Sequence, residues 1–208
     1  METPRAGQIT VVVLTVLAFI VRFAKLNHPD QVVYVSAFRL LGLDKLNFRP
    51  NSFDEVHFGK FAAYYLRREY YFDVHPPFAK LLLALAGWFV GFEGDFDFSN
   101  IGDSYTANNV PYWGMRALPA ILGSLTVPAA YYIMQESGYS TIVAAFSAII
   151  ILFGKFPDTS RCLIAGTNWR PDNAHVTQSR LILLDAILIF FMSLTIYSYI
   201  KFRKYRYQ

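Results

Sequence analysis

Cysteine is nearly absent from this sequence of 208 residues, in which Cys162 is the only one. A single thiol excludes a disulfide framework within the chain and a metal site built from several cysteines. The sequence also contains no Asn-x-Ser/Thr motif, so N-glycosylation gives no indication of the compartment. Charged residues make up 16% of the chain and hydrophobic residues 54%, so the distribution of the apolar residues decides its class.

The apolar residues are gathered into long blocks, which is the pattern of a protein that spans a membrane. We expect four spans, near residues 9–24, 115–134, 141–153 and 181–200. The third block is shorter than the roughly 20 residues that a bilayer requires. The first is also short, and we expect the long side chains of Arg22 and Lys25 to extend from its end to the interface.

A group of cations follows the last apolar block directly: Lys201, Arg203, Lys204 and Arg206. Cations next to a span mark the cytoplasmic side and favour anionic lipid headgroups, so we do not expect a nucleic-acid partner. With four spans, the N-terminus lies on the same side as these cations. Residues 25–112 are then predicted to form one large loop on the opposite face of the membrane.

Two segments of this loop are predicted to form helices that lie in the membrane interface. The first has apolar residues at helical spacing, namely Phe58, Phe61, Ala62 and Tyr65. The second covers Phe78 to Phe92, begins after Pro76 and Pro77, and ends near Gly91. Proline suits the first turn of a helix and glycine its end. The alternative, a fifth span, would put the N-terminus and the last residues on opposite faces, and Arg5 favours a cytoplasmic N-terminus, so we favour four spans.

An adjacent pair of carboxylates, Asp54 and Glu55, lies at the start of the first loop helix. Such a group can act as a general base on a hydroxyl or hold a metal ion. Residues Ser52 to Glu55 also fit the S-x-x-E capping box, in which Glu55 reaches back to the start of the helix. From the local sequence alone, the capping role is the more common one.

A second polar group follows at Asp73 and His75, directly before two prolines. Together with Asp54 and His57 these side chains could ligate a metal ion through oxygen and imidazole nitrogen. The alternative is that Asp73 caps the next helix and His75 is a polar group at the interface. The spacing is not diagnostic of a metal site, and we expect no obligatory metal.

Two arginines, Arg116 and Arg180, lie near the non-cytoplasmic ends of apolar blocks. Two guanidinium groups at one depth suit a phosphate, which they bind bidentately. The alternative is that both side chains simply extend to the interface, and spacing leaves the two interpretations open. Carboxylates and phosphate-binding cations on one membrane face are what transfer from a lipid phosphate requires.

Longer motifs resemble those of the protein O-mannosyltransferases. They are FDEVHFG (Phe53–Gly59), DVHPP (Asp73–Pro77), IGDSY (Ile101–Tyr105), VPYWGMRALPA (Val110–Ala120) and DNAHVTQSRLILLDA (Asp172–Ala186). The resemblance implies an all-α integral membrane protein of the endoplasmic reticulum with a GT-C type fold. It also implies dolichyl phosphate mannose as the donor, Ser and Thr of secretory-pathway proteins as acceptors, and a homo- or heterodimer with another family member.

The resemblance assigns roles to the polar residues. Asp54 is the expected general base, Glu55 supports it or positions the acceptor, and a single displacement inverts the donor linkage. Arg116 and Arg180 are expected to offset the charge that develops on the departing dolichyl phosphate. Three further residues are expected to support this site: Asp73, His75 and His57.

The sequence departs from the family pattern in two segments and in its length. Residues 34–52 and 154–171 interrupt motifs that relatives join directly, so we interpret both as insertions. Family members also continue through further spans and a luminal MIR region, which do not occur before Gln208. We therefore expect a truncated GT-C membrane region. The alternative hypothesis is a non-catalytic subunit or a degenerate fragment that pairs with a full-length transferase.

Overall fold

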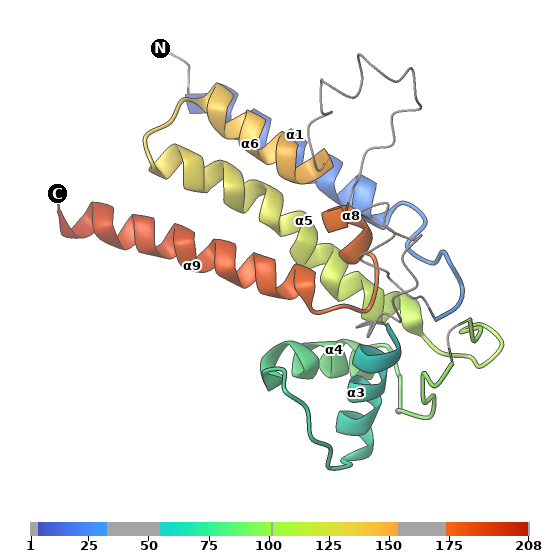
Figure 1. Ribbon diagram of the computed structural model, residues 1–208. Helices are drawn as coiled ribbons and strands as arrows, with labels where there is room; N and C mark the ends of the chain where they lie inside the picture. Colours follow the sequence, from blue (N-terminus) through green and yellow to red (C-terminus); the bar gives the residue numbers. More distant parts are fainter. Residues whose placement is uncertain (1–3, 33–54, 101, 154–173, 208) are drawn as a thin grey trace, which may run out of the picture.

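The computed structural model describes residues 4–32, 55–100, 102–153 and 174–207, and this part of the chain is helical with connecting loops (Figure 1). The helices are α1 (Pro4–Phe23), α3 (Glu55–Arg67), α4 (Pro77–Phe89), α5 (Tyr112–Glu136), α6 (Thr141–Phe153), α8 (Ala174–Gln178) and α9 (Asp185–Arg206). The predicted all-α class is therefore confirmed for the residues described. The two segments interpreted as insertions lie outside them.

Four helices, α1, α5, α6 and α9, run alongside one another, and each is antiparallel to the next along the chain (Figure 1). The start of α1 and the end of α9 lie at one end of this bundle (Figure 1). The helices α3, α4 and α8 lie towards the other end. The described parts of the 24–111 loop therefore lie opposite the start of α1 and the end of α9, as four passes would require. The side of a membrane that each end meets stays a prediction.

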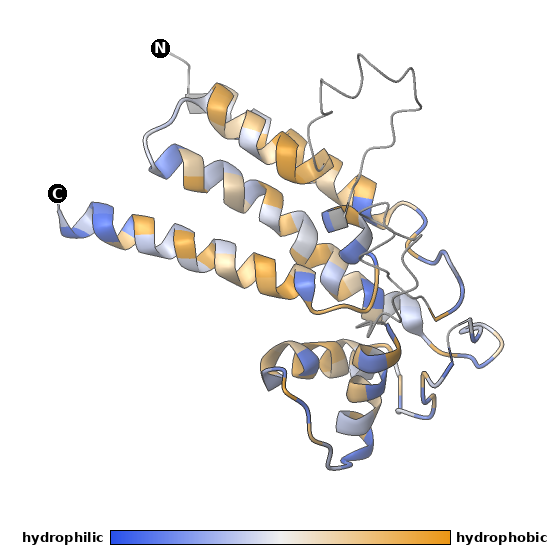
Figure 2. Ribbon diagram, viewed as in Figure 1, coloured by the Kyte–Doolittle hydropathy of each residue, from blue (hydrophilic) through white to orange (hydrophobic). Residues whose placement is uncertain are grey.

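Three helices of the described part of the chain are long and apolar enough to cross a membrane: Ala6–Phe23 of α1, α5 and α9. The expected third span, α6, has only 13 residues, as does α4. At 1.5 Å per residue each is about 20 Å long, against roughly 30 Å of bilayer hydrocarbon. Apolar residues prevail in the sequence of α1. They also prevail in α6, whereas the C-terminal end of α9 is hydrophilic (Figure 2).

Small residues let α1 approach α5 closely. Ala18 is fully buried, and its carbonyl accepts a hydrogen bond of 3.3 Å from the Ser124 hydroxyl. Farther along the same pair of helices, the Tyr131 hydroxyl donates to the Gly7 carbonyl at 3.1 Å. Close backbone approach at small residues is the usual basis of helix packing inside a membrane. These contacts fix where the end of α1 meets α5.

The two loop helices α3 and α4 share a core with the start of α9. Phe58 and Ala62 of α3 are buried, as the helical spacing predicted, and they pack in one cluster with Leu83 and Ile182. The predicted helix over the second loop segment is confirmed as α4. The last span was expected from residue 181, but α9 begins at Asp185. The reason is that residues 181–183 turn into the core of the loop region.

Candidate functional site

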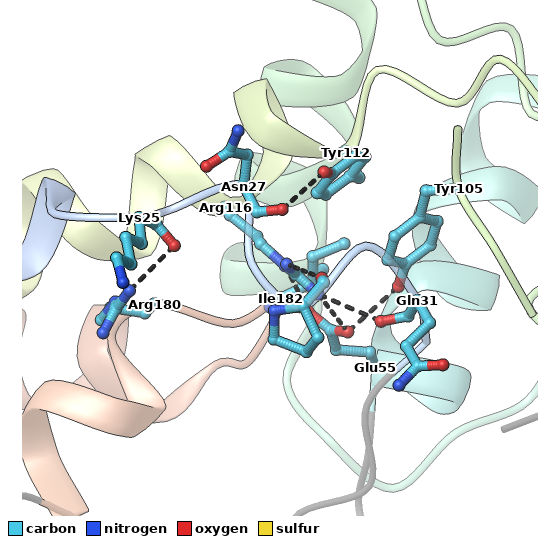
Figure 3. Close-up of polar contacts among 10 residues, drawn as sticks. Lys25, Asn27, Gln31, Glu55, Tyr105, Tyr112, Arg116, Arg180 and Ile182 are labelled. Carbon is cyan, nitrogen blue, oxygen red and sulfur yellow. Dashed lines mark hydrogen bonds and ion pairs between the residues drawn. The ribbon is translucent and has the colours of Figure 1, made fainter. Parts of the chain in front are cut away.

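Glu55 is the first residue of α3, and its side chain is completely buried. Arg116 binds the carboxylate with both arms of its guanidinium: Nε donates to Oε1 and Nη2 to Oε2, each at 2.8 Å. The Tyr105 hydroxyl donates to Oε2 at 3.0 Å, and the Ile182 backbone N–H donates to Oε1 at 3.1 Å (Figure 3). Four donors from three other segments therefore surround this carboxylate.

Each side-chain nitrogen of Arg116 also has a hydrogen-bond partner. Its side chain is completely buried in the second turn of α5. Besides the bonds to Glu55, Nη1 donates to the Pro29 carbonyl at 2.8 Å, and Nη2 donates to the Gln31 carbonyl at 3.3 Å. A buried ion pair repays its desolvation only when the remaining donors and lone pairs are also satisfied, and here four of the five N–H groups of Arg116 have a partner.

Two tyrosine rings flank the ion pair. The centre of the Arg116 guanidinium lies 5.4 Å from the Tyr105 ring and 5.0 Å from the Tyr112 ring, and the two rings stack at 4.6 Å. Burial and the neighbouring Glu55 carboxylate raise the pKa of Tyr105, so its hydroxyl stays protonated and remains a donor. The Tyr112 hydroxyl donates to the Asn27 carbonyl at 2.7 Å, which holds the loop after α1 over the site (Figure 3).

The expected base, Asp54, directly precedes Glu55 in the sequence and lies outside the described residues. Its role therefore stays a prediction. The capping-box alternative involves Ser52, which also lies outside them. In the structure the Glu55 side chain forms an ion pair with Arg116.

The second polar group is centred on Asp73. Lys80 of α4 donates to Asp73 Oδ2 at 2.8 Å, and the His75 Nδ1 lies 3.1 Å from both carboxylate oxygens. Desolvation opposes ionisation of Asp73, but the hydrogen bonds from Lys80 and His75 outweigh it and lower the pKa of Asp73 to about 2. His75 also meets the Phe58 ring edge-on at 5.9 Å, so the group braces the first turns of α3.

Lys80 was not anticipated from the sequence, although a lysine within an apolar helix was a usable signal. It is only 3% exposed and lies 5.1 Å and 5.3 Å from the centres of the Phe61 and Tyr71 rings. His57, the other expected supporting residue, stacks on Phe61 at 6.4 Å. Within the described residues no three His, Cys, Asp or Glu side chains form a metal-binding group.

Arg180 lies in the turn before α9, beside the end of α1. Its Nη2 donates to the carbonyls of Ala24 and Lys25, the latter at 2.9 Å (Figure 3). Burial, and then the charge of Arg116, lower the pKa of Arg180. The Arg180 Nε has no hydrogen-bond partner among the described residues. Of the two expected phosphate ligands, Arg180 therefore keeps the larger unused donor capacity.

Arg22 differs from its expected position. It was predicted to extend to the interface, but its side chain is 0% exposed. Its Nη2 lies 2.9 Å from Nδ1 of His175 in α8, a residue 153 positions away in the chain. That separation is why sequence reasoning missed the pair.

Comparison with known proteins identifies the family. The family of dolichyl-phosphate-mannose-protein mannosyltransferases matches residues 33–208. The chain is 47% identical over 195 residues to dolichyl-phosphate-mannose–protein mannosyltransferase 4 of Candida albicans, covering 94% of this chain and 21% of the relative. It is 37% identical over 195 residues to protein O-mannosyl-transferase 1 of Rattus norvegicus, covering 93% and 21%.

A solved structure agrees. The chain is similar to a chain in the structure of the Saccharomyces cerevisiae protein O-mannosyltransferase Pmt1–Pmt2 complex bound to the sugar donor, with a TM-score of 0.73 and 38% identity. The match covers 97% of this chain and 22% of that one. This chain belongs to the dolichyl-phosphate-mannose–protein mannosyltransferase family, and the expected GT-C type fold is confirmed. It spans about a fifth of the length of the curated relatives it matches.

Proposed function

We propose that this chain forms the acidic-loop part of an enzyme that transfers mannose from dolichyl phosphate mannose to Ser or Thr hydroxyls of secretory-pathway proteins. The names of its relatives support the donor and the reaction. The observation that carries the proposal is the anchoring of Glu55, which fixes the start of α3 directly after Asp54. The acidic loop then lies on the luminal face of the endoplasmic reticulum membrane.

In the proposed reaction the acceptor oxygen bonds to the anomeric carbon of mannose as the bond from that carbon to the phosphate oxygen breaks. Asp54 takes the proton of the acceptor hydroxyl. The electron pair of the broken bond leaves with dolichyl phosphate. Attack on the face opposite the phosphate inverts the β-linked donor to an α-mannoside.

The arginines take different parts in this proposal. Arg180 offsets the charge of the departing phosphate, since it is half-buried and, among the described residues, its guanidinium bonds backbone carbonyls and not a carboxylate. A direct phosphate contact by Arg116 stays a prediction from the resemblance. Its donors already bond Glu55 and two carbonyls, which supports a role in positioning the acidic residues instead.

We infer that the working protein pairs with another family member. The support is that the similar solved structure is a complex of two such proteins, Pmt1 and Pmt2. Asp73 and His75 are proposed to support the site by bracing α3 through Phe58.

The test uses the full-length protein in detergent or membranes with dolichyl phosphate mannose and an acceptor peptide. Asp54→Asn is expected to lower turnover by about 10²- to 10⁴-fold, the usual contribution of a general base. The matched control is Asp95→Asn, which changes an exposed aspartate of the same loop. Turnover of Asp54→Asn equal to that of the control would remove Asp54 as the base.

A further inference from the structure

The Arg22 side chain is buried, although Arg22 lies at the end of a predicted span, where a long side chain could reach water. It occupies the last turn of α1 and is 0% exposed. Only Nη2 has a partner, the His175 Nδ1, whereas Nε and Nη1 form no hydrogen bond with the described residues. Ionisable residues within spans are costly, so one that is kept buried commonly serves a function.

The hydrogen bond from Arg22 ends on His175, in the turn of residues 175–180. The last residue of this turn, Arg180, bonds to the residues that follow α1. The turn is continuous, because the Ser179 N–H donates to the His175 carbonyl and the Arg180 N–H donates to the Thr177 carbonyl, each at 3.1 Å. At its far end the Arg180 Nη2 donates to the carbonyls of Ala24 and Lys25. Those two residues directly follow α1, so the two arginines hold the turn from both of its ends.

The third side of this arrangement is α5. A Cβ added to Gly123 would lie 2.6 Å from the Ser179 Cβ and 3.3 Å from the Arg22 Nε. Glycine at this position therefore lets the turn lie directly on α5. The same packing separates Arg22 from solvent, so Arg22 is not itself a surface that meets a ligand.

His175 is suited to its part in the contact. Its Nδ1 accepts from a cation, so its proton resides on Nε2. Burial, and then the charge of Arg22, lower the pKa of His175 to about 4. The ring is neutral at physiological pH and remains an acceptor there.

We propose that Arg22 is a positioning residue that acts through His175 to hold Arg180 at the donor end of the bundle. The inference rests on the proposed role of Arg180 at the donor phosphate. Removal of the contact should let the turn shift and weaken donor use, without any loss of a group that touches the acceptor.

The test compares His175→Leu with His175→Asn in the full-length enzyme. Leucine removes the acceptor, whereas the asparagine Oδ1 replaces Nδ1. His175→Leu is expected to raise the KM for dolichyl phosphate mannose by about tenfold, because a hydrogen bond to a charged group is worth roughly a tenfold change in the equilibrium that it stabilises. His175→Asn is expected to keep most of the wild-type donor KM. The KM for the acceptor peptide should be unchanged in both.

A double variant shows whether the effect passes through Arg180. Arg180→Gln alone should raise the donor KM, and adding His175→Leu to it should raise the KM little further. If His175→Leu does not fold, Gly123→Ala serves instead, because it displaces the turn without removing a polar group. It should also raise the donor KM.

Two results would overturn the inference: a wild-type donor KM in His175→Leu or Gly123→Ala, or a full additional effect of His175→Leu in the Arg180→Gln background. The proposed function fails in a different way. There, Arg180→Gln would leave kcat/KM for the donor unchanged, or Asp54→Asn would retain turnover.

Discussion

Replacing Glu55 by glutamine tests whether the buried ion pair holds the loop region together. The substitution preserves size, so it creates no cavity, but it removes the charge that compensates Arg116. Both side chains are 0% exposed, and an uncompensated charge at such a site costs about 3–5 kcal/mol. Taking the part of the protein formed by this chain as one cooperative unit, 1 kcal/mol shifts its melting temperature by roughly 2–4 °C, so we expect its transition to fall by about 10 °C.

The measurement is thermal unfolding of the full-length protein in detergent, followed by intrinsic fluorescence. Glu93→Gln is the matched control, because Glu93 is an exposed glutamate of the same loop. The double variant Glu55→Gln, Arg116→Met removes both charges and is expected to recover part of the loss. A Glu55→Gln protein that melts with the control would refute the reasoning, since the carboxylate could then not be compensating a buried cation.

Two further changes test the loop region. The pKa of Asp73 is about 2 in the folded protein and 3.8 ordinarily, so the unfolded state binds more protons between these values. The melting temperature should therefore fall as pH falls from about 4 towards 2, and Asp73→Asn should make it depend less on pH. The same slope in Asp73→Asn as in the wild type would contradict this prediction. Gly59→Ala places a Cβ 2.5 Å from the Phe98 ring and should destabilise by about 1–3 kcal/mol, whereas Gly59→Ala with Phe98→Leu should lose less in the same melting assay.

The sequence predicted the helices well because their cause is local. Apolar blocks and helical spacing marked α1, α4, α5 and α9. The start of α9 was wrong by a few residues, since Leu181 to Leu183 continue the apolar block but pack into the loop core. An apolar run has the same appearance whether it continues a helix or fills a core, so composition does not separate the two.

The contacts between individual side chains were harder to predict from the sequence. Glu55 and Arg116 were both singled out, yet their contact joins residues 61 positions apart and depends on how α3 meets α5. Arg22 was expected at the interface because it lies at the end of an apolar block. Its contact with His175 could not be predicted, since the two residues are far apart in the sequence. Residue type predicts which side chains can act as bases, acids or phosphate ligands. Tertiary packing decides which of these side chains form hydrogen bonds or ion pairs with one another.

The bond between Glu55 and the Ile182 N–H also has a consequence for biosynthesis. The two residues are 127 positions apart, and chains grow at about 5–20 residues per second. After Glu55 is made, roughly 6–25 s pass before Ile182 is added. Tyr105 and Arg116 are made earlier and can bind the carboxylate before then, whereas the Ile182 N–H completes its surroundings only as the start of α9 is added.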